Sequence, residues 1–264
     1  MTKFKAIFTD IDGTLLNSKR IVDEKTILAI SQLKSRNIKF GIATGRPVKN
    51  IKHLIESWKI IDYVDYIIGI NGVEVYDVLN DKQYNNYFLE PSKIQEIYNI
   101  SKDLPCSTIV YDKDIIVSSN NNDLLKFHSN KVGYDYHIVD FNDYTKNTYP
   151  KMLLMANKEY HDEIICKIKE ISGISIFQSA DYLLEIVDER VNKSYGINII
   201  KNLLKLDNNE IVTFGDQLND LEMINDYYGV AMGNAIDEIK NVSKYVTDSN
   251  DESGIAKFIF DNIF

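Results

Sequence analysis

A short, fully apolar run near the N-terminus ends abruptly in two carboxylates. Ala6, Ile7 and Phe8 precede Asp10 and Asp12 in the sequence FKAIFTDIDGTLLN. Such a run is typical of a strand that is buried on both faces of a parallel sheet. Residues two apart on a strand point the same way, so we expect both carboxylates to face one site beyond the strand's C-terminal end. Because two converging carboxylates repel each other, the pair predicts a bound cation, a shared proton, or both.

Short apolar strands alternate with amphipathic helices at both ends of the chain. The predicted strands span residues 40–43, 66–70 and 211–214, and predicted helices start near Asp23, Pro47 and Lys193. Residues 73–76 are expected to return beside the third strand as a hairpin partner. This alternation predicts right-handed βαβ units and a parallel sheet. Residues 1–81 and 189–264 are therefore predicted to form an α/β, Rossmann-like core.

The pattern changes after a cluster of Asn and Asp near residue 80. Helices are predicted over residues 91–104, 123–131 and 158–171, and strands over residues 107–111, 115–118, 151–156, 174–178 and 182–187. Residues 82–188 are therefore predicted to form an inserted α+β domain rather than a linker.

Charge and composition exclude several classes of partner. The formal net charge is −9 and the pI is about 5.0, so the chain lacks the basic footprint of a nucleic-acid binder and would be repelled by an anionic membrane. No segment approaches the ~18 apolar residues of a membrane span. Cys106 and Cys166 have no metal-ligand spacing and are expected to be free thiols, with one disulfide as the alternative. We expect a cytoplasmic protein.

Four polar segments each follow a predicted strand or begin a predicted helix of the core. They are residues 10–14, residues 44–46, Lys193 and residues 215–220. The carboxyl ends of parallel strands meet at one edge of a sheet, so these segments are expected to converge. Together they supply carboxylates, one hydroxyl, one ammonium and several turn N–H groups. That inventory suits Mg²⁺, which prefers oxygen ligands, bound beside a phosphate group.

These segments give the chain a resemblance to a known family. It resembles a haloacid dehalogenase (HAD) superfamily phosphatase of the Cof-type branch, with an α/β cap inserted between the second and third motifs. The matching motifs are DIDGTL at residues 10–15, Thr44 in ATGR, Lys193, and GDQLND at residues 215–220; further similar segments are NG at residues 71–72, MGNA at residues 232–235 and DESGIA at residues 251–256. Ser194 departs from the common pattern, in which Gly follows the lysine directly.

The resemblance implies a role for each main motif residue. Asp10 would be the nucleophile that forms an aspartyl-phosphate. Asp12 would act as general acid and then as base, with crowding by Asp10 favouring its protonated form. Mg²⁺ would be held by Asp10, the Asp12 backbone carbonyl and Asp216. Thr44 and Lys193 would bind phosphoryl oxygens.

Other motif residues keep two interpretations. Asp220 is either a second metal ligand or a partner of Lys193, and Asn219 is expected to orient the phosphoryl group or the nucleophile. Gly13 would let turn N–H groups approach the phosphate.

Thr44 could instead cap the following helix, but Gly45 frees the backbone there and favours a catalytic role. Arg46 would touch the substrate or be a solvated helix-start residue. Asn71 would reach the leaving group or only serve the hairpin turn.

The leading hypothesis is a Mg²⁺-dependent phosphatase that acts on a small phosphorylated metabolite, such as a sugar phosphate or a cofactor-related phosphate. The inserted domain would exclude water and select the leaving group. A phosphomutase of the same superfamily and a non-catalytic phosphate- or Mg²⁺-binding protein remain alternatives. A carbon–halogen hydrolase is disfavoured, because it has no leaving alkoxide for Asp12 to protonate. The substrate is left open, and we expect a monomer or a small homo-oligomer.

Overall fold

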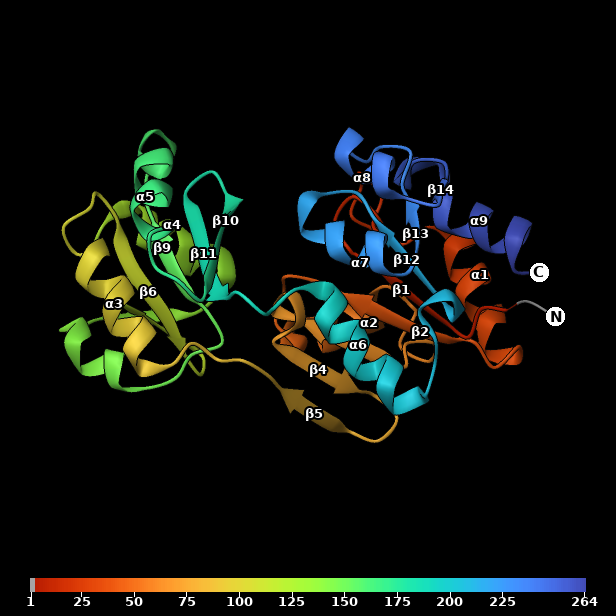
Figure 1. Ribbon diagram of the computed structural model, residues 1–264, viewed down its shortest axis with the longest axis horizontal. Coiled ribbons are helices and arrows are strands. Elements are labelled where there is room, and N and C mark those ends of the chain that lie inside the picture. The colour runs from red at the N-terminus through yellow and green to blue at the C-terminus, as the bar shows by residue number, and fades with distance from the viewer. Residues whose placement is uncertain (1–2) are drawn as a thin grey trace. The chain divides into compact units, whose positions relative to one another are not determined.

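In the computed structural model, which describes residues 3–264, the chain forms two units (Figure 1). The first comprises the chain up to Asn86 together with Val191–Phe264, and the second is the continuous segment Tyr87–Arg190. The sequence places these limits at 81/82 and 188/189. The first limit differs because residues 82–85 pair with the preceding strand and thereby extend the first unit.

The first unit is built on an eight-stranded sheet in the order β14-β13-β12-β1-β2-β3-β4-β5. Its strands are β1 (Ala6–Thr9), β2 (Lys39–Ala43), β3 (Tyr66–Gly69), β4 (Glu74–Asp77), β5 (Lys82–Asn85), β12 (Ile211–Gly215), β13 (Tyr228–Ala231) and β14 (Tyr245–Val246). All neighbours from β14 to β3 pair in parallel, whereas β3, β4 and β5 form an antiparallel meander. The predicted α/β class with a parallel-sheet core is confirmed.

Strand order reverses at the centre of this sheet. From β1 the chain moves to β2 and β3 on one side, and from β12 it moves to β13 and β14 on the other. The two strands pair with each other in the register Ala6↔Ile211 to Thr9↔Phe214. Ligands of open α/β sheets bind beyond the carboxyl ends of the strands at such a switch point. The fold therefore marks the ends of β1 and β12 as the place for a site.

Helices cover both faces of the sheet. They are α1 (Glu24–Ser35), α2 (Val48–Ser57), α6 (Lys193–Leu204), α7 (Leu221–Asp226), α8 (Asp237–Val242) and α9 (Gly254–Asn262), with 3₁₀ turns η1 (Ile70–Gly72), η4 (Asn208–Glu210), η5 (Leu218–Asp220) and η6 (Asn250–Glu252). Helix α1 contacts α9, whereas α7 contacts both α6 and α8. Right-handed crossovers in opposite directions from β1 and β12 place α1 and α7 on opposite faces.

Local signals explain where two of these helices begin. Asp23 caps α1, because its carboxylate accepts hydrogen bonds from the backbone N–H groups of Lys25 and Thr26. The sequence suggested that Pro47 is the first residue of α2. In the structure Pro47 is instead the N-cap, because its ψ of 145° is still extended. All four residues of β1 are buried, as expected for a strand that is covered on both faces.

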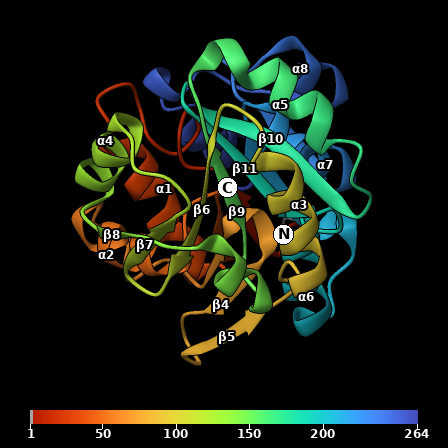
Figure 2. The same ribbon diagram turned by 90° about the vertical axis from the view of Figure 1, so that its left-hand side faces the viewer.

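The second unit carries a six-stranded sheet in the order β10-β11-β9-β6-β7-β8. Its elements are α3 (Pro91–Ser101), β6 (Ser107–Asp112), β7 (Ile115–Ser118), α4 (Asp123–Val132), β8 (Asp135–Ile138), η2 (Phe141–Lys146), β9 (Met152–Met155), η3 (Lys158–Tyr160), α5 (His161–Ile168), β10 (Ile174–Ala180) and β11 (Leu183–Asp188). Only β7 and β8 pair in parallel within this sheet. Helices α3 and α5, which contact each other, can be followed in Figure 2.

The second unit has two apolar clusters of its own. The larger joins residues of α3 and α5 to Val110, Leu154 and Ile186 of the sheet. The smaller includes Leu125 of α4 and alternate residues of the same strands, as expected for a sheet covered on both faces. Both cysteines are free, Cys106 buried and Cys166 exposed. Among the described residues, none of the helices has the length and apolar character needed to span a membrane.

Candidate active site

The first carboxylate of the sequence follows directly on β1 and is tied to the neighbouring strand. The backbone N–H of Asp10 donates to the carbonyl of Phe214 in β12 at 3.0 Å. This bond continues the parallel ladder of the two strands by one residue. The Asp10 side chain is buried, so the pairing of β1 with β12 fixes a carboxylate inside the unit at the switch point.

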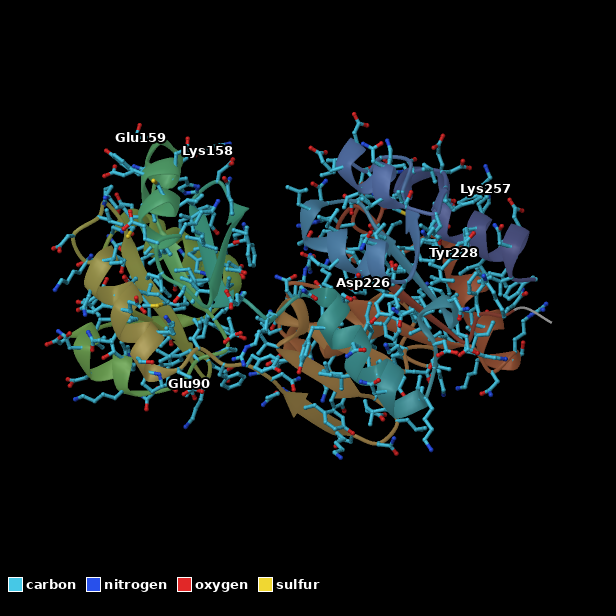
Figure 3. The ribbon with its side chains drawn as sticks, in the orientation of Figure 1. Glu90, Lys158, Glu159, Asp226, Tyr228 and Lys257 are labelled. Carbon is cyan, nitrogen blue, oxygen red and sulfur yellow. The ribbon has the colours of Figure 1, made fainter. Side chains whose placement is uncertain are left out.

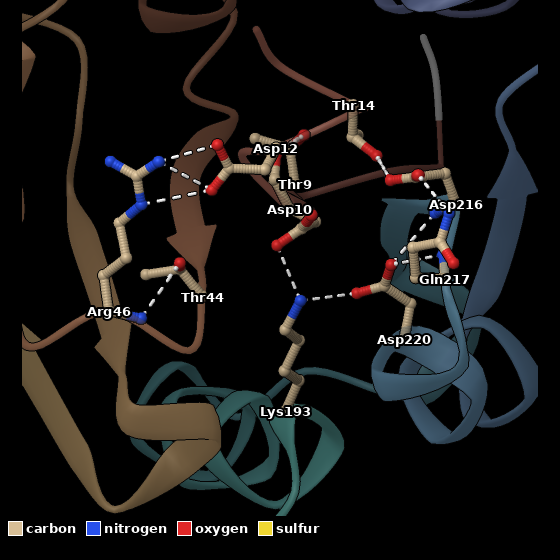
Figure 4. Close-up of polar contacts among 10 residues, drawn as sticks. All are labelled: Thr9, Asp10, Asp12, Thr14, Thr44, Arg46, Lys193, Asp216, Gln217 and Asp220. Carbon is tan, nitrogen blue, oxygen red and sulfur yellow. Dashed lines mark hydrogen bonds and ion pairs between the residues drawn. The ribbon is translucent and has the colours of Figure 1, made fainter. Parts of the chain in front are cut away.

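Lys193 lies between two carboxylates. It is the first residue of α6, and it is 0% exposed to solvent. Its Nζ donates to Asp10 Oδ1 and to Asp220 Oδ1, at 2.6 Å in each case (Figure 4). A buried ammonium without such partners would carry a large desolvation penalty. The two ion pairs therefore stabilise the charged form of Lys193. The N-terminus of a helix also favours anions nearby, here the two carboxylates.

Close backbone approaches fix the start of α6. A Cβ on Gly72 would lie 2.2 Å from the carbonyl oxygen of Asn192, so only glycine permits the η1 turn to touch the N-cap of this helix. A Cβ on Gly196 would lie 3.2 Å from Gly72 Cα. Ser194, which departs from the family pattern, donates from Oγ to Asp226 Oδ2 at 2.6 Å; Asp226 is labelled in Figure 3. These contacts hold the helix start, and with it Lys193, in place.

Asp220 uses both of its carboxylate oxygens within the protein. Oδ1 accepts from Lys193 Nζ, and Oδ2 accepts from the backbone N–H groups of Asp216 at 2.9 Å and Gln217 at 3.1 Å. A Cβ on Gly215 would lie 2.5 Å from Asp220 Cβ, so the turn after β12 folds tightly around this side chain. Asp220 therefore links the ammonium of α6 to the turn that follows β12.

Asp216, at the end of β12, is held by hydroxyl and amide groups. Its Oδ1 accepts from Thr14 Oγ1 at 2.7 Å, and its Oδ2 accepts from Gln217 Nε2 at 3.1 Å. Gly13 lies directly against it with a positive φ of 85°, and a Cβ there would lie 2.4 Å from Asp216 Oδ2. Only glycine therefore lets the turn after β1 approach the carboxylate after β12 this closely.

The charges of this cluster do not balance. One ligand oxygen from each of Asp10, Asp216 and Asp220 can be chosen so that all three lie within 4.8 Å of one another, and all three residues are buried. Burial raises the pKa of Asp10 to about 7, although the Lys193 ammonium acts in the opposite direction. Burial also raises the pKa of Asp216. For Lys193, burial acts to lower the pKa, but Asp10 and Asp220 outweigh it and raise the pKa. Three carboxylates against one ammonium favour a further cation or proton.

Asp12 does not share this cluster. It directs its carboxylate toward Arg46, whose Nη2 lies 2.6 and 2.7 Å from the two carboxylate oxygens and whose Nε lies 3.1 Å from Oδ2 (Figure 4). Arg20 Nη2 is 3.8 Å away, and the Asp12 side chain is 50% exposed. The expectation that strand alternation aims Asp10 and Asp12 at one point is wrong, because β1 ends at Thr9 and Asp12 lies in the following turn.

The segment after β2 forms a compact turn beside this pair. Thr44 is buried, and its Oγ1 accepts from the backbone N–H of Arg46 at 3.2 Å. Thr44 does not cap α2, because Pro47 is the N-cap residue of that helix. The alternative for Arg46, a solvated helix-start residue, also differs from the structure, since this guanidinium forms a forked ion pair with Asp12. A Cβ on Gly45 would lie 3.4 Å from Asn71 Nδ2.

The two asparagines proposed from the sequence differ in their surroundings. Asn71 is buried in the η1 turn with a left-handed φ of 51°, between Ile70 (47°) and Gly72 (112°). Its Oδ1 has no hydrogen-bond partner among residues 3–264. Its backbone N–H donates to the carbonyl of Thr44 at 2.9 Å, so the residue joins the ends of β2 and β3. Asn219 is exposed on η5, outside the hydrogen-bonded cluster.

The structure brings most of the predicted residues to one edge of the sheet. Asp10, Lys193, Asp216 and Asp220 form one connected group with Gly13 beside it, and Asp12, Arg46, Thr44, Gly45 and Asn71 lie along the turns after β1, β2 and β3. Thr14 and Gln217 were not assigned to the site from the sequence, although both lie inside its motifs. Their roles come from side-chain bonds to Asp216, which the motif pattern does not display.

Comparison with known proteins identifies the family. Residues 7–259 match the family model described as haloacid dehalogenase-like hydrolase. A protein of Bacillus subtilis named "Putative phosphatase YxeH" is 27% identical over 97% of this chain and 97% of its own length. The 5-amino-6-(5-phospho-D-ribitylamino)uracil phosphatase YcsE of the same organism is 26% identical over 97% of this chain and 94% of its own length.

A solved structure agrees with this assignment. The crystal structure of TM0651 from Thermotoga maritima superimposes with a TM-score of 0.84 and 27% identity, covering 98% of this chain and 97% of the other. The family model spans nearly the whole sequence, including the motifs at the ends of β1, β2 and β12 and at the start of α6. The resemblance seen in the sequence is confirmed: the chain belongs to the haloacid dehalogenase-like hydrolases and is an enzyme of that family.

Proposed function

We propose that this protein is a Mg²⁺-dependent phosphatase that hydrolyses small phosphorylated metabolites through an aspartyl-phosphate. The observation that carries the proposal is the buried group of Asp10, Asp216, Asp220 and Lys193 at the switch point of the sheet. Carboxylates beside a fixed ammonium suit a hard cation and a phosphoryl group together. The relative YcsE, whose name describes a phosphatase acting on a phosphorylated ribitylamino-uracil, supports the same reaction class.

The donor set fits Mg²⁺. Asp10 and Asp216 would supply carboxylate oxygens and Asp12 its backbone carbonyl, an all-oxygen set of the kind that Mg²⁺ prefers. Asp220 would not be a direct ligand, because its Oδ1 is paired with the buried Lys193 ammonium and its Oδ2 accepts from two backbone N–H groups. The Asp216 carboxylate is instead held by the side chains of Thr14 and Gln217, which can rotate to free its oxygens for a metal. We assign to Asp220 the task of holding Lys193. When bound, Mg²⁺ supplies Lewis-acid stabilisation of charge on the phosphoryl oxygens.

The residues of the chain divide the reaction into two displacements. Asp10 attacks phosphorus, the ester P–O bond breaks, and Asp12 gives its proton to the leaving oxygen to release the alcohol. Asp12 then takes a proton from water, the water oxygen attacks phosphorus, and the Asp10–phosphorus bond breaks to release inorganic phosphate. Asp12 is half exposed and forms an ion pair with Arg46. It would therefore have to leave Arg46 and take up a proton from solvent before it could protonate the leaving oxygen in the first transfer.

The remaining site residues would bind the phosphoryl group or the substrate. Lys193 and Thr44 would contact phosphoryl oxygens, and the N–H groups around Gly13 and Gly45 would approach them closely. The other candidates for substrate contact are Arg46, Asn71 and Asn219. Selection of the leaving group is assigned to the second unit, Tyr87–Arg190. The proposed setting is cytoplasmic, with a monomer or small homo-oligomer and neither nucleic acid nor membrane as partner.

The test of this proposal is hydrolysis of p-nitrophenyl phosphate with Mg²⁺, with excess EDTA, and by the Asp10→Asn variant. We expect turnover that needs the metal and vanishes in the variant, because the amide cannot form the acyl phosphate. Turnover that survives both changes would contradict the mechanism. If folded protein shows no turnover on this substrate or on a panel of phosphorylated metabolites, labelling of Asp10 by a phosphate donor would favour a mutase, and absence of labelling a binding role.

The pH dependence of metal binding gives a second expected result. A carboxylate must lose its proton before it binds a metal, so a raised pKa makes binding weaker at low pH. With the pKa of Asp10 at about 7, the half-saturating Mg²⁺ concentration should fall about tenfold between pH 6 and pH 8. A Mg²⁺ titration of the thermal unfolding midpoint at pH 6, 7 and 8 measures this. A flat profile would mean that Asp10 is already ionised in the metal-free protein.

A further inference from the structure

Two asparagines from the C-terminal part of the chain bind the turn that follows β1. Asn234 Nδ2 donates to the carbonyl of Gly13 at 2.8 Å, and Asn250 Nδ2 donates to the carbonyl of Leu16 at 2.8 Å. The backbone N–H of Asn250 donates to Asn234 Oδ1 at 3.0 Å. This last bond fixes which end of the Asn234 amide faces Gly13. The two side chains therefore hold both ends of the turn, and the backbone of Asn250 is linked to the side chain of Asn234.

The bound turn lies against Asp216. Within this turn, Gly13 and Thr14 touch the carboxylate, Gly13 through a close backbone approach and Thr14 through a hydroxyl bond of 2.7 Å. A shift of Gly13 toward Asp216 meets the carboxylate at once, and a shift away draws Thr14 off Asp216 Oδ1. The position of the turn thus constrains the Asp216 carboxylate, and Asn234 is a side-chain donor to the Gly13 carbonyl of that turn.

Two further hydrogen bonds join residues 251–253 to the loop between the turn after β1 and helix α1. The backbone N–H of Ser18 donates to Asp251 Oδ1 at 2.8 Å, and Ser253 Oγ donates to Asp23 Oδ1 at 2.9 Å. These bonds attach the loop before α1 but touch neither Gly13 nor Asp216. They provide a matched comparison, since removing one of them loosens the loop without releasing the turn at the site.

We propose that Asn234 and Asn250 are positioning residues, which hold the turn after β1 so that Asp10 and Asp216 keep the spacing that a divalent cation requires. The inference rests on the proposed function for its link to Mg²⁺, but the attachment itself does not. It assigns a task to Asn234 of the MGNA segment and to Asn250, which directly precedes the DESGIA segment. The proposed mechanism uses neither residue. Partners that orient metal ligands are commonly worth a factor of about 10 to 100 in metal affinity or activity.

The experiment compares Asn234→Ala and Asn250→Ala with Asp251→Ala. Asn234 is exposed and Asn250 is partly exposed, so neither change opens the apolar core, and the unfolding midpoint without metal should stay within about 2 °C of the parent. In Asn234→Ala the half-saturating Mg²⁺ concentration for turnover should rise about tenfold. The KM of the substrate should change little. Asn250→Ala should shift the metal requirement in the same direction, and Asp251→Ala should leave it unchanged.

Amide hydrogen exchange supplies a readout that does not depend on turnover. The N–H groups of Leu15 and Leu16 donate to the carbonyls of Asp10 and Ile11 within the turn, and their exchange should accelerate about tenfold in Asn234→Ala. Unchanged exchange, an unchanged Mg²⁺ requirement, or an equal effect of Asp251→Ala would overturn the inference. If the parent shows no Mg²⁺-dependent turnover, the proposed function fails separately. In that case Mg²⁺ binding is measured by the shift of the thermal unfolding midpoint. The absence of such a shift would overturn the positioning role as well.

Discussion

Replacement of Lys193 by alanine is expected to abolish turnover and to lower the free energy of unfolding by about 3–5 kcal/mol. The reason is that Asp10 and Asp220, both buried, would lose the ammonium that lies 2.6 Å from each. A buried carboxylate without a partner must either take up a proton or draw water into the site. Denaturant unfolding followed by circular dichroism measures the stability, and p-nitrophenyl phosphate hydrolysis measures the activity.

Two further variants separate the site from the helix. Lys201→Ala changes a lysine of the same helix whose Nζ bonds Asn208 at the surface, and its effect on stability should be within about 0.5 kcal/mol. The double variant Lys193→Met with Asp220→Asn removes one charge of each sign. It should recover part of the lost stability but none of the turnover. An equally large loss of stability in Lys201→Ala would show that the buried ion pairs do not stabilise the site. Full activity of Lys193→Ala would show that they are not needed for turnover.

Substitution of Gly13 by alanine is expected to lower kcat by about 100-fold. The φ of 85° costs an alanine about 1–2 kcal/mol, and the new methyl group would meet Asp216 Oδ2 at 2.4 Å. Asp216 can yield only by giving up its bonds to Thr14 or Gln217. Steady-state kinetics over a range of Mg²⁺ concentrations should show a raised metal requirement as well as a lower kcat.

Gly133 provides the matched control for this variant. It ends α4 with a φ of 75°, and no heavy atom lies within 4 Å of the position of a Cβ there. Gly133→Ala therefore carries the backbone cost of a positive φ without a collision, and it should lose about 1–2 kcal/mol of stability with no change in kcat. If both variants lose activity equally, the effect at Gly13 is one of stability and not of contact with Asp216.

The sequence predicted part of the core from its apolar residues, although the buried strand β13 and the helices α7, α8 and α9 were not predicted. The strands β1, β2, β3 and β12 are short apolar runs that are buried in the sheet, so their pattern and their place in the fold agree. The strands β5 (KQYN) and β8 (DYHI) were missed because they are edge strands of largely polar or exposed residues. Their pairing depends on backbone hydrogen bonds, which residue type does not display.

The site shows the same division. Convergence of strand ends correctly brought Asp10, Lys193, Asp216 and Asp220 together. The pairing of Asp12 with Arg46 was not predicted, because it depends on the conformation of the turn after β1 rather than on residue spacing. The link from Asn234 to Gly13 joins residues 221 positions apart, and nothing in either segment alone indicates its partner.

The central place of β1 in the sheet has a consequence for the order in which the chain folds. One edge of β1 pairs with β2, but the other pairs with β12, which begins at Ile211, beyond the whole of Tyr87–Arg190. During synthesis at about 5–20 residues per second, roughly 7–26 s separate the completion of β5 from that of β12. The continuous second unit can fold within this interval, while the edge of an apolar strand in the first unit stays unpaired. The nascent chain is therefore most open to wrong strand pairing in the interval before β12 is made.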